Sequence, residues 1–410
     1  MPIPNKMPLG SDSNPAWSRL YTDFSSMIQP KREGFLLLQP YMNLTCAILL
    51  TTFCASMAHS ESIDLLEDPD AWLLENTSEG IYSIQETGIR AKRRSYESAT
   101  ILSREDFENF RMAFEFKLRK DCELIFLMHA PRNGAYGAGL ELVLSDHVGK
   151  TPTPFTAGAL FGLRPGLSNP IRRENEWNTC EVLMDWPRLR VTLNDEVIQD
   201  LDLSEHEDLR YKLRRGAFGY RDLLGWGYEL RNMSLEPLPD SEGSLVMFNG
   251  KNLKGWKEVR KGDATFTVRD GVIVGENGNG YLQYKQSNYD FDLRLYYRTT
   301  PTANGGVFFR WKSDDSERGN EIQILDVGQA TSPSGTIYNV ERASGVPMRP
   351  GEWHLMQVSV RGSHAITHLD GIRAAETHEL VNLWPGHITL QMHKENSTIE
   401  FKDLILVVHD

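Results

Sequence analysis

Short runs of alternating hydrophobic and polar residues dominate the chain from Ile63 onward. These runs are rich in β-branched and aromatic residues and are separated by Gly, Pro, Asn and Asp, a pattern typical of strands joined by turns. Long segments with a 3.6-residue hydrophobic period are absent from the sequence. We therefore expect an all-β fold. Many short strands favour a sandwich or jelly roll, because a single open sheet could not bury one face of each strand.

The order of these segments is repeated along the chain. The first half contains "FENFRMAFEFKL", "GLELVLSD" and "NEWNTCEVLM" in that order, and the second half contains "YDFDLRLYYRT", "NEIQILD" and "GEWHLMQVSV". The stretch "EPLPDSEGS" between the halves has the composition of a linker. Repetition in a fixed order predicts two copies of one sandwich fold. We expect the first copy over residues 59–238, a linker over 239–244 and the second copy over 245–410.

An apolar run near the N-terminus, Leu44 to Cys54, ends in "ASMA", with small residues at both positions that determine cleavage. This pattern predicts a secretory signal peptide that is cut after Ala58. Residues 1–58 are then leader and signal peptide, with translation starting at Met27 or Met42. About 11 apolar residues fall short of the ~20 that span a bilayer, which disfavours a permanent transmembrane anchor. We expect a periplasmic or secreted protein with no membrane span after removal of the signal.

The net charge bears on the partners of the protein. The formal net charge is -12, and the densest cationic run, "RAKRRS", is short. Such a chain has no extended basic surface with which to bind phosphates, so we expect no nucleic-acid partner. The sequence says nothing about the oligomeric state.

Two cysteines, Cys122 and Cys180, remain after removal of the predicted signal peptide. Both lie in strand-like stretches, and an oxidising compartment would permit them to pair. Two separate buried thiols are the alternative, because spacing in the sequence does not show whether the two Cα atoms lie within disulfide reach.

The segment "GNEIQILDVG" is the first candidate for chemistry. Glu321 and Gln323 are two residues apart, so both side chains point to one face of a strand. Ile322 and Ile324 point the other way, into the core between two sheets. Asp326 lies at an odd offset from Glu321, which puts it on the opposite face unless a bulge intervenes or the strand has ended. We predict one of these two irregularities. The alternative to a functional site is that these polar residues form an ordinary solvent-exposed strand face.

Other strands add polar groups that could converge with this pair. They are Arg310 in "GGVFFRW", Tyr338 in "SGTIYNV", and Gln391 and His393 in "ITLQMHKE". If the strands are neighbours, these groups form the kind of polar hollow expected of a binding or catalytic site. Trp311 is the expected surface for stacking of a sugar. No metal-binding motif occurs, so we expect no cofactor and no catalytic metal, although the sequence leaves a structural Ca²⁺ open.

The second half resembles the 3-keto-disaccharide hydrolase family, which has a concanavalin-like jelly roll. The resemblance rests on "SLVMFNGKNLKGWK", "NGGVFFR", "NEIQILD", "SGTIYNV", "PGEWH" and "GHITLQMH". It implies two tandem concanavalin/laminin-G-like jelly-roll β-sandwiches and a carbohydrate substrate with a ketone at C3. A base would remove the acidified C2 proton, the glycosidic oxygen would leave, and water would add back.

The resemblance also suggests roles for individual residues. Glu321 or His393 would be the general base, and Asp326 or His393 would protonate the departing oxygen. Arg310 and Gln323 would stabilise the enolate-like oxygen, and Tyr338, Gln391 and Trp311 would bind substrate. The "EIQILD" strand also resembles that of laminarinase-like endoglucanases, with Gln323 and Asp326 in place of acidic residues, which makes an ordinary glycosidase a weaker alternative.

The first half has a depleted polar set. It keeps Glu141 but has Val143 in place of the glutamine and Phe161 in place of the tyrosine, and it offers Arg221 near the position of His393. We expect a divergent copy with a binding or structural role. A pair of non-catalytic carbohydrate-binding modules, or a laminin-G-like adhesion protein, remains an alternative to an enzyme because the fold does not decide function.

Overall fold

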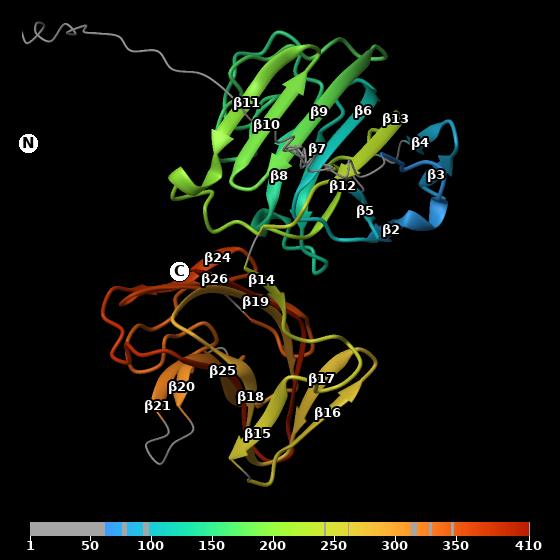
Figure 1. The fold of residues 1–410 in the computed structure, drawn as a ribbon. Helices are drawn as coiled ribbons and strands as arrows, with labels where there is room; N and C mark the ends of the chain where they lie inside the picture. The colour runs from blue at the N-terminus through green and yellow to red at the C-terminus, as the bar shows by residue number, and fades with distance from the viewer. Residues whose placement is uncertain are drawn as a thin grey trace, which may run out of the picture. The chain divides into compact units, whose positions relative to one another are not determined.

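A computed structural model describes residues 62–75, 80–92, 98–241, 243–260, 262–312, 318–327, 330–345 and 348–409. The predicted leader and signal peptide, residues 1–58, lies outside the described residues. Among those described, the only helices are three single 3₁₀ turns of three residues each. No helix in this part of the chain is long and apolar enough to cross a membrane. The predicted all-β fold is confirmed (Figure 1).

The first copy is a sandwich of two antiparallel sheets, coloured blue to green in Figure 1. Its eight-stranded sheet has the order β11 (Glu196–Asp202), β10 (Arg188–Leu193), β9 (Trp177–Asp185), β6 (Phe110–Leu118), β13 (Tyr228–Pro237), β4 (Gly88–Ala91) and β3 (Tyr82–Gln85), with β1 (Ile63–Asp64) also on β13. Its five-stranded sheet has the order β2 (Trp72–Glu75), β5 (Ala99–Ser103), β12 (Ala217–Asp222), β7 (Leu124–Ala130) and β8 (Leu140–Val143).

The second copy, coloured yellow to red, is built in the same way. Its eight-stranded sheet has the order β24 (Ile372–Thr377), β23 (His364–Leu369), β22 (His354–Arg361), β19 (Asp290–Thr299), β26 (Thr398–His409), β17 (Val272–Glu276) and β16 (Thr265–Arg269), with β14 (Ser244–Val246) also on β26. Its five-stranded sheet has the order β15 (Trp256–Arg260), β18 (Asn279–Asn288), β25 (Gly386–His393), β20 (Gly305–Lys312) and β21 (Arg318–Ile324).

Each strand of the first copy has a counterpart in the second at the same place in the same sheet. Details are repeated as well. The indole Nε1 of Trp72 donates to the carbonyl of Leu65 at 3.0 Å, and that of Trp256 donates to Met247 at 2.8 Å. The repeat found in the sequence therefore corresponds to two copies of one topology.

Alternation along the strands builds the core of each sandwich. Inward residues such as Phe114 and Phe126 in the first copy, and Phe291 and Phe309 in the second, are almost fully buried. Their outward neighbours are left for solvent or for a site. Cys122 and Cys180 are not paired with each other but are two separate buried thiols, which was the alternative to a disulfide.

Candidate functional site

The outer face of the five-stranded sheet in the second copy carries most of the predicted polar side chains. Strand register sets them in two rows across β21, β20, β25 and β18. One row contains Glu321, Phe308, Thr389 and Gln283; the other contains Gln323, Gly306, Gln391 and Tyr281. The strands are neighbours, as the sequence argument required. Four of the predicted residues, Glu321, Gln323, Tyr338 and Gln391, therefore share one region of one face.

Glu321 is a half-buried ionisable group on this face. Its strand neighbour Ile322 is fully buried in the core, so the glutamate points outward. The carboxylate lies over Gly306, which has no side chain to occupy that space: a Cβ atom there would be 2.5 Å from Glu321 Oε1. Burial raises the pKa of Glu321 from 4.5 to about 7, because a partly desolvated carboxylate is disfavoured in its charged form. Such a group can accept a proton near neutral pH.

The two glutamines are held by the sheet. Gln323 Nε2 donates to Asn304 Oδ1 at 2.7 Å and to the carbonyl of Gly305 at 3.0 Å. Gln391 Nε2 donates to the hydroxyl of Tyr281 at 3.0 Å. Both side chains are more than nine-tenths buried. The amide groups of both glutamines therefore already donate hydrogen bonds within the protein. Gln323 is for this reason less available to stabilise an enolate oxygen than the sequence analysis expected.

Tyr338 and His393 are the exposed members of the predicted set. The backbone N–H of Tyr338 donates to the carbonyl of Glu321 at 2.9 Å, which places the tyrosine beside the glutamate. His393 is at the end of β25, two residues beyond Gln391 on the same face. Two strand spacings and four residues separate it from Glu321, about 16 Å between Cα atoms. Glu321 and His393 could thus act on one substrate only from opposite sides of it.

Trp311 does not form the open stacking surface that the sequence suggested. It is 3% exposed and stacks on Tyr281, with ring centroids 5.2 Å apart and planes 14° apart. Phe308 meets the same indole edge-on at 4.8 Å. Phe308 itself is half-buried. The accessible aromatic surface next to Glu321 is therefore offered by Phe308 and Tyr338 rather than by the tryptophan.

Arg310 lies away from the candidate site. It is fully buried, and its guanidinium donates to the carbonyls of Tyr289 and Asn382 at 3.0 and 3.3 Å and to Asp290 Oδ1 at 3.2 Å. The backbone of Arg310 has a φ of 51°, which breaks the alternation of β20 and turns the side chain away from the face that carries Gly306 and Phe308. The structure gives this arginine a bracing role within the sandwich.

Asp326 is also separated from Glu321. Strand β21 ends at Ile324, which is one of the two irregularities predicted, but the aspartate still faces the other sheet. Its carboxylate accepts hydrogen bonds from Tyr297 at 3.2 Å, Thr299 at 2.6 Å and Ser334 at 2.5 Å, and it is 7% exposed. This hydrogen bonding is that of a structural carboxylate. It removes the second acid that a laminarinase-like glycosidase would need about 5–5.5 Å from Glu321.

The first copy shows how the same face looks when it is closed. Its outer face carries an apolar cluster: Leu102, Ile125, Leu127, Ala130, Tyr136, Val143, Ala159 and Ala217. Tyr136 is 5% exposed, and its hydroxyl donates to Glu75 at 2.8 Å. The face that is polar around Glu321 is thus filled and covered in the first copy.

Glu141 is the counterpart of Glu321 on this closed face, and it has a cation beside it. A guanidinium nitrogen of Arg221 lies 3.9 Å from Glu141 Oε1. Burial raises the pKa of Glu141, and Arg221 and Lys212 act in the opposite direction. Strand register puts Arg221 at the position of Gln391, two residues from the predicted position near His393.

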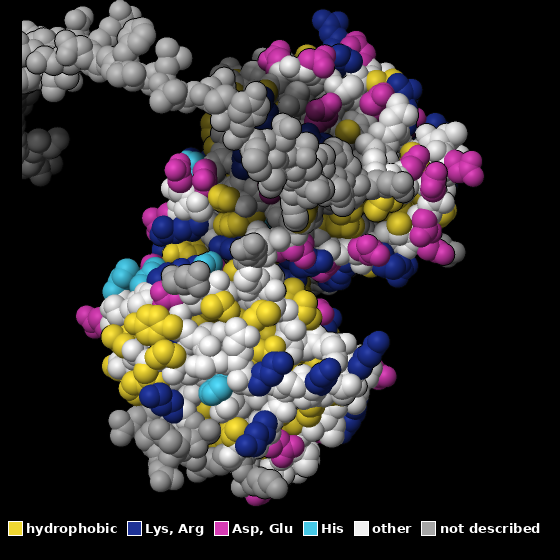
Figure 2. Space-filling view, viewed as in Figure 1, with side chains coloured by type: hydrophobic (Ala, Val, Ile, Leu, Met, Phe, Trp, Pro, Cys, Tyr) yellow, Lys and Arg dark blue, Asp and Glu magenta, His cyan; other side chains and the backbone are white. Residues whose placement is uncertain are grey.

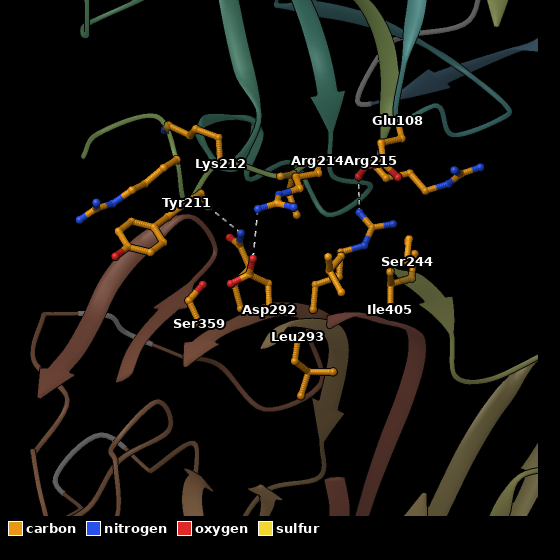
Figure 3. A pocket seen from close by; sticks show the side chains of 15 residues that line it. Glu108, Tyr211, Lys212, Arg214, Arg215, Ser244, Asp292, Leu293, Ser359 and Ile405 are labelled. Carbon is orange, nitrogen blue, oxygen red and sulfur yellow. Dashed lines mark hydrogen bonds and ion pairs between the residues drawn. The ribbon is translucent and has the colours of Figure 1, made fainter. Parts of the chain in front are cut away.

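A separate pocket lies against the eight-stranded sheet of the second copy. Residues 210–215 and residues of that sheet line the pocket (Figure 3). Arg214 donates to Asp292 Oδ2 at 3.2 Å, and Gln357 Nε2 donates to the carbonyl of Tyr211 at 2.9 Å. Burial would raise the pKa of Asp292, but His409, Arg361 and Arg214 together hold it well below its usual value. The cavity measures about 60 Å³, room for a few water molecules and not for a sugar.

Comparison with known proteins places the chain in a family. The model of the 3-keto-alpha-glucoside-1,2-lyase-like domain matches residues 65–231 and again residues 243–406. The chain belongs to this family. The predicted resemblance of the second half is confirmed, and the match to the first half confirms that it is a copy of the same domain. The family model thus matches both copies, and membership of this family supports a role of the protein in acting on carbohydrates. No match was found among curated proteins.

Solved structures are similar to single copies of the lyase-like domain. One, from Parabacteroides distasonis and provisionally named a glycosyl hydrolase, is 21% identical with a TM-score of 0.36; the match covers 41% of this chain and 95% of that one. The carbohydrate-binding module CBM66 from Bacillus subtilis is 16% identical with a TM-score of 0.31, covering 37% and 93%. The lumenal domain of VIP36, bound to Ca²⁺ and Man₃GlcNAc, is 15% identical with a TM-score of 0.33, covering 45% and 92%.

Proposed function

We propose that the second copy cleaves 3-keto-glycosides at the outer face of its five-stranded sheet, with Glu321 as the general base. The observation that carries this proposal is the contrast between the two copies. The second holds a half-buried carboxylate over Gly306, whereas in the first the equivalent Glu141 has the Arg221 guanidinium 3.9 Å away, and Ile125 of an apolar cluster occupies the position of Gly306. The family to which the chain belongs is named for lyase chemistry on 3-keto-alpha-glucosides.

The chemistry follows from the ketone. Glu321 removes the proton at C2, and the electron pair of the C2–H bond moves to form an enolate with the C3 carbonyl. The enolate then expels the glycosidic oxygen from C1, leaving a C1=C2 double bond, and the departing oxygen takes up a proton. Water adds across the double bond, with its oxygen at C1 and a proton at C2. A carboxyl with a pKa of about 7 suits the first step, because its basic form is populated at neutral pH.

The structure suggests a different proton donor from those predicted. Asp326 is engaged by three hydroxyl groups on the inter-sheet side. Tyr338 is 43% exposed and its backbone is hydrogen-bonded to that of Glu321, so we take its hydroxyl as the candidate donor. We assign to this hydroxyl the role of protonating the departing glycosidic oxygen or of donating a hydrogen bond to the ketone oxygen. His393, at the far end of the face, is then suited to bind the second sugar of a disaccharide. The proposed setting is extracytoplasmic, as the signal-like N-terminus suggests.

The test uses the duplication as its own control. Purified protein is incubated with a 3-keto-glucoside, and released aglycone is measured for the native chain, Glu321→Gln and Glu141→Gln. The two substitutions are chemically identical and fall at equivalent positions of the two copies. We expect Glu321→Gln to lose at least 100-fold in kcat/KM and Glu141→Gln to stay within about twofold. Equal activity of native protein and Glu321→Gln would refute the proposal.

The second candidate function is sugar binding without catalysis. It is favoured by the engaged amide groups of Gln323 and Gln391, which hold a rigid polar face. In that case the native chain would bind 3-keto-glucosides in a calorimetric titration but release no aglycone. Glu321→Gln would then change affinity without any turnover to lose.

A further inference from the structure

Three side chains capable of binding a metal meet at the edge of the eight-stranded sheet of the second copy. They are His364, Glu376 and His378, and their ligand atoms all lie within 4.8 Å of one another. Figure 2 shows histidine side chains gathered at the region of β24. The outer face of the five-stranded sheet, which holds Glu321, belongs to the other sheet of the sandwich. This cluster therefore has no part in the function proposed above.

Strand register creates the cluster. Ala365 of β23 pairs with Thr377 and Ile366 pairs with Glu376, so His364 comes opposite His378. Glu376 is two residues from His378 and therefore on the same face. The rings of His364 and His378 lie parallel, 4.3 Å between centroids and 9° between planes. His364 Nε2 is 2.9 Å from Glu376 Oε1. Three ligands are thus presented together by two paired strands.

We propose that His364, Glu376 and His378 bind one divalent transition-metal ion, with Zn²⁺ the best match, and that water completes the coordination. Two imidazoles and one carboxylate are ligands that Zn²⁺ takes readily. Bonds of 2.0–2.2 Å in a tetrahedral arrangement put ligand atoms about 3.3–3.5 Å apart. The contact between His364 and Glu376 needs to open slightly, and the widest pair of ligand atoms needs to close by at most about 1.5 Å. The exposed side chain of His378 can supply that movement.

An outer group already orients one ligand. Arg373 donates to Glu376 Oε2 at 2.8 Å, which leaves Oε1 directed at His364. Hydrogen bonds of this kind fix the carboxylates and imidazoles that hold metals. Strand β24 is at the edge of its sheet. A metal that joined it to β23 would stabilise this edge pairing.

The first copy supplies the comparison that separates a metal site from ordinary surface charge. Strand register puts Arg188, Asp200 and Asp202 at the positions of His364, Glu376 and His378. Arg188 pairs with Asp200 at 3.1 Å. The first copy therefore holds the same strand pair with a surface ion pair, whereas the second copy has histidines at the positions of the arginine and of one aspartate.

The test is a Zn²⁺ titration of the full chain without a histidine tag, by calorimetry or by competition with a fluorescent chelator. The central variant is the double substitution His364→Arg with His378→Asp, which installs the ion-pair chemistry of the first copy. His378→Asn, at an exposed position, serves as a second variant that should fold normally. His206→Gln, a histidine of the first copy outside the cluster, is the control.

The native chain and His206→Gln should bind one Zn²⁺ at this site. The double variant and His378→Asn should bind it at least about 100-fold more weakly, a larger loss than removal of an outer partner causes. Circular dichroism verifies that each variant is folded. A native chain that binds no Zn²⁺, or a double variant that binds it as tightly as the native chain, would overturn the proposal.

Discussion

The carboxylate of Glu321 occupies the space above Gly306, where a Cβ atom would stand 2.5 Å from Oε1 and 2.9 Å from Cγ of the glutamate. The two residues are on adjacent strands, and the missing side chain of one determines where the functional group of the other rests. In the first copy Ile125 occupies the position of Gly306 and is part of the apolar cluster. The open face of the second copy thus depends on this glycine.

Gly306→Ala should displace the Glu321 carboxylate. The backbone of Gly306 is not among those with positive φ, so alanine is conformationally allowed there. The atoms nearest to the added Cβ belong to Glu321 and to the carbonyl of Ile322, and these contacts must adjust. A shift of about 1 Å in a catalytic group can reduce activity about 100-fold. We expect a loss of that order in kcat/KM on a 3-keto-glucoside, with circular dichroism unchanged. A folded variant with native activity would show that the position of this carboxylate is unimportant.

The pH dependence of activity should follow the ionisation of Glu321. A general base works in its deprotonated form, and burial raises the pKa of this group to about 7. The rate kcat/KM should therefore fall as the pH drops below about 7, tenfold per unit on the acidic limb. A pH–rate profile between pH 4.5 and 9 measures this. An acidic limb centred near 4.5 would instead indicate an ordinary, solvated carboxylate.

Glu321→Gln should stabilise the fold at alkaline pH while it removes activity. The folded-state pKa of Glu321 is above the ordinary value of 4.5, so the folded protein loses stability as the pH rises from 4.5 through 7. Glutamine has no charge to bury. After allowance for partial exposure we expect a gain of about 1–2 kcal/mol at pH 8, and little difference at pH 4.5. Urea unfolding at the two pH values tests this, and a pH-independent difference would contradict it.

Asp326→Ala should destabilise the protein without changing the catalytic step. The hydroxyls of Tyr297, Thr299 and Ser334 would lose their common acceptor in a buried place. Unsatisfied buried donors cost about 1–3 kcal/mol each, so we expect a loss of at least about 2 kcal/mol in urea unfolding. The rate per folded molecule should be unchanged. Loss of activity with native stability would instead identify Asp326 as a catalytic acid.

Much of the fold could be predicted from the sequence because strand periodicity and internal repetition are local signals. The alternation in "NEIQILD" correctly predicted that Glu321 and Gln323 lie on one face of the strand and that Ile322 lies in the core. The repeated order of segments correctly predicted two copies of one fold, whereas the pairing of the strands that carry the polar residues was only a condition of the sequence argument. Which side chains then remain available to a ligand was harder to predict, because hydrogen bonding within the sheet engages Gln323 and Gln391.

Arg310 shows why strand alternation alone could not identify every site residue. Gly386 approaches its backbone so closely that a Cβ atom would stand 2.3 Å from the carbonyl carbon of Arg310. Arg310 has a positive φ at this crossing, and so does His129 at the equivalent crossing in the first copy, where Gly216 takes the place of Gly386. This contact joins distant segments of the chain, so no local pattern reveals it. Because of this contact, Arg310, which the sequence analysis assigned to ligand binding, is instead buried and hydrogen-bonded within the sandwich.

The proposed metal site of His364, Glu376 and His378 shows a second kind of signal that sequence reasoning missed. His364, Glu376 and His378 do not form a sequence motif, because 12 residues separate the first two. They come together only through the pairing of β23 and β24. A strand-pairing prediction for the second half, compared with the ion pair of Arg188 and Asp200 in the first, would have found them.

The elimination mechanism is tested most directly by cleavage of a 3-keto-glucoside in D₂O. The 3-keto-glucose product is examined by NMR at early times, with free 3-keto-glucose incubated without enzyme as the control for spontaneous exchange. Removal of the C2 proton followed by hydration predicts solvent deuterium at C2 of the product formed by the native chain and by Glu141→Gln, and at least about 100-fold slower product formation by Glu321→Gln. Product that keeps its original hydrogen at C2, or turnover by Glu321→Gln at the native rate, would contradict the account.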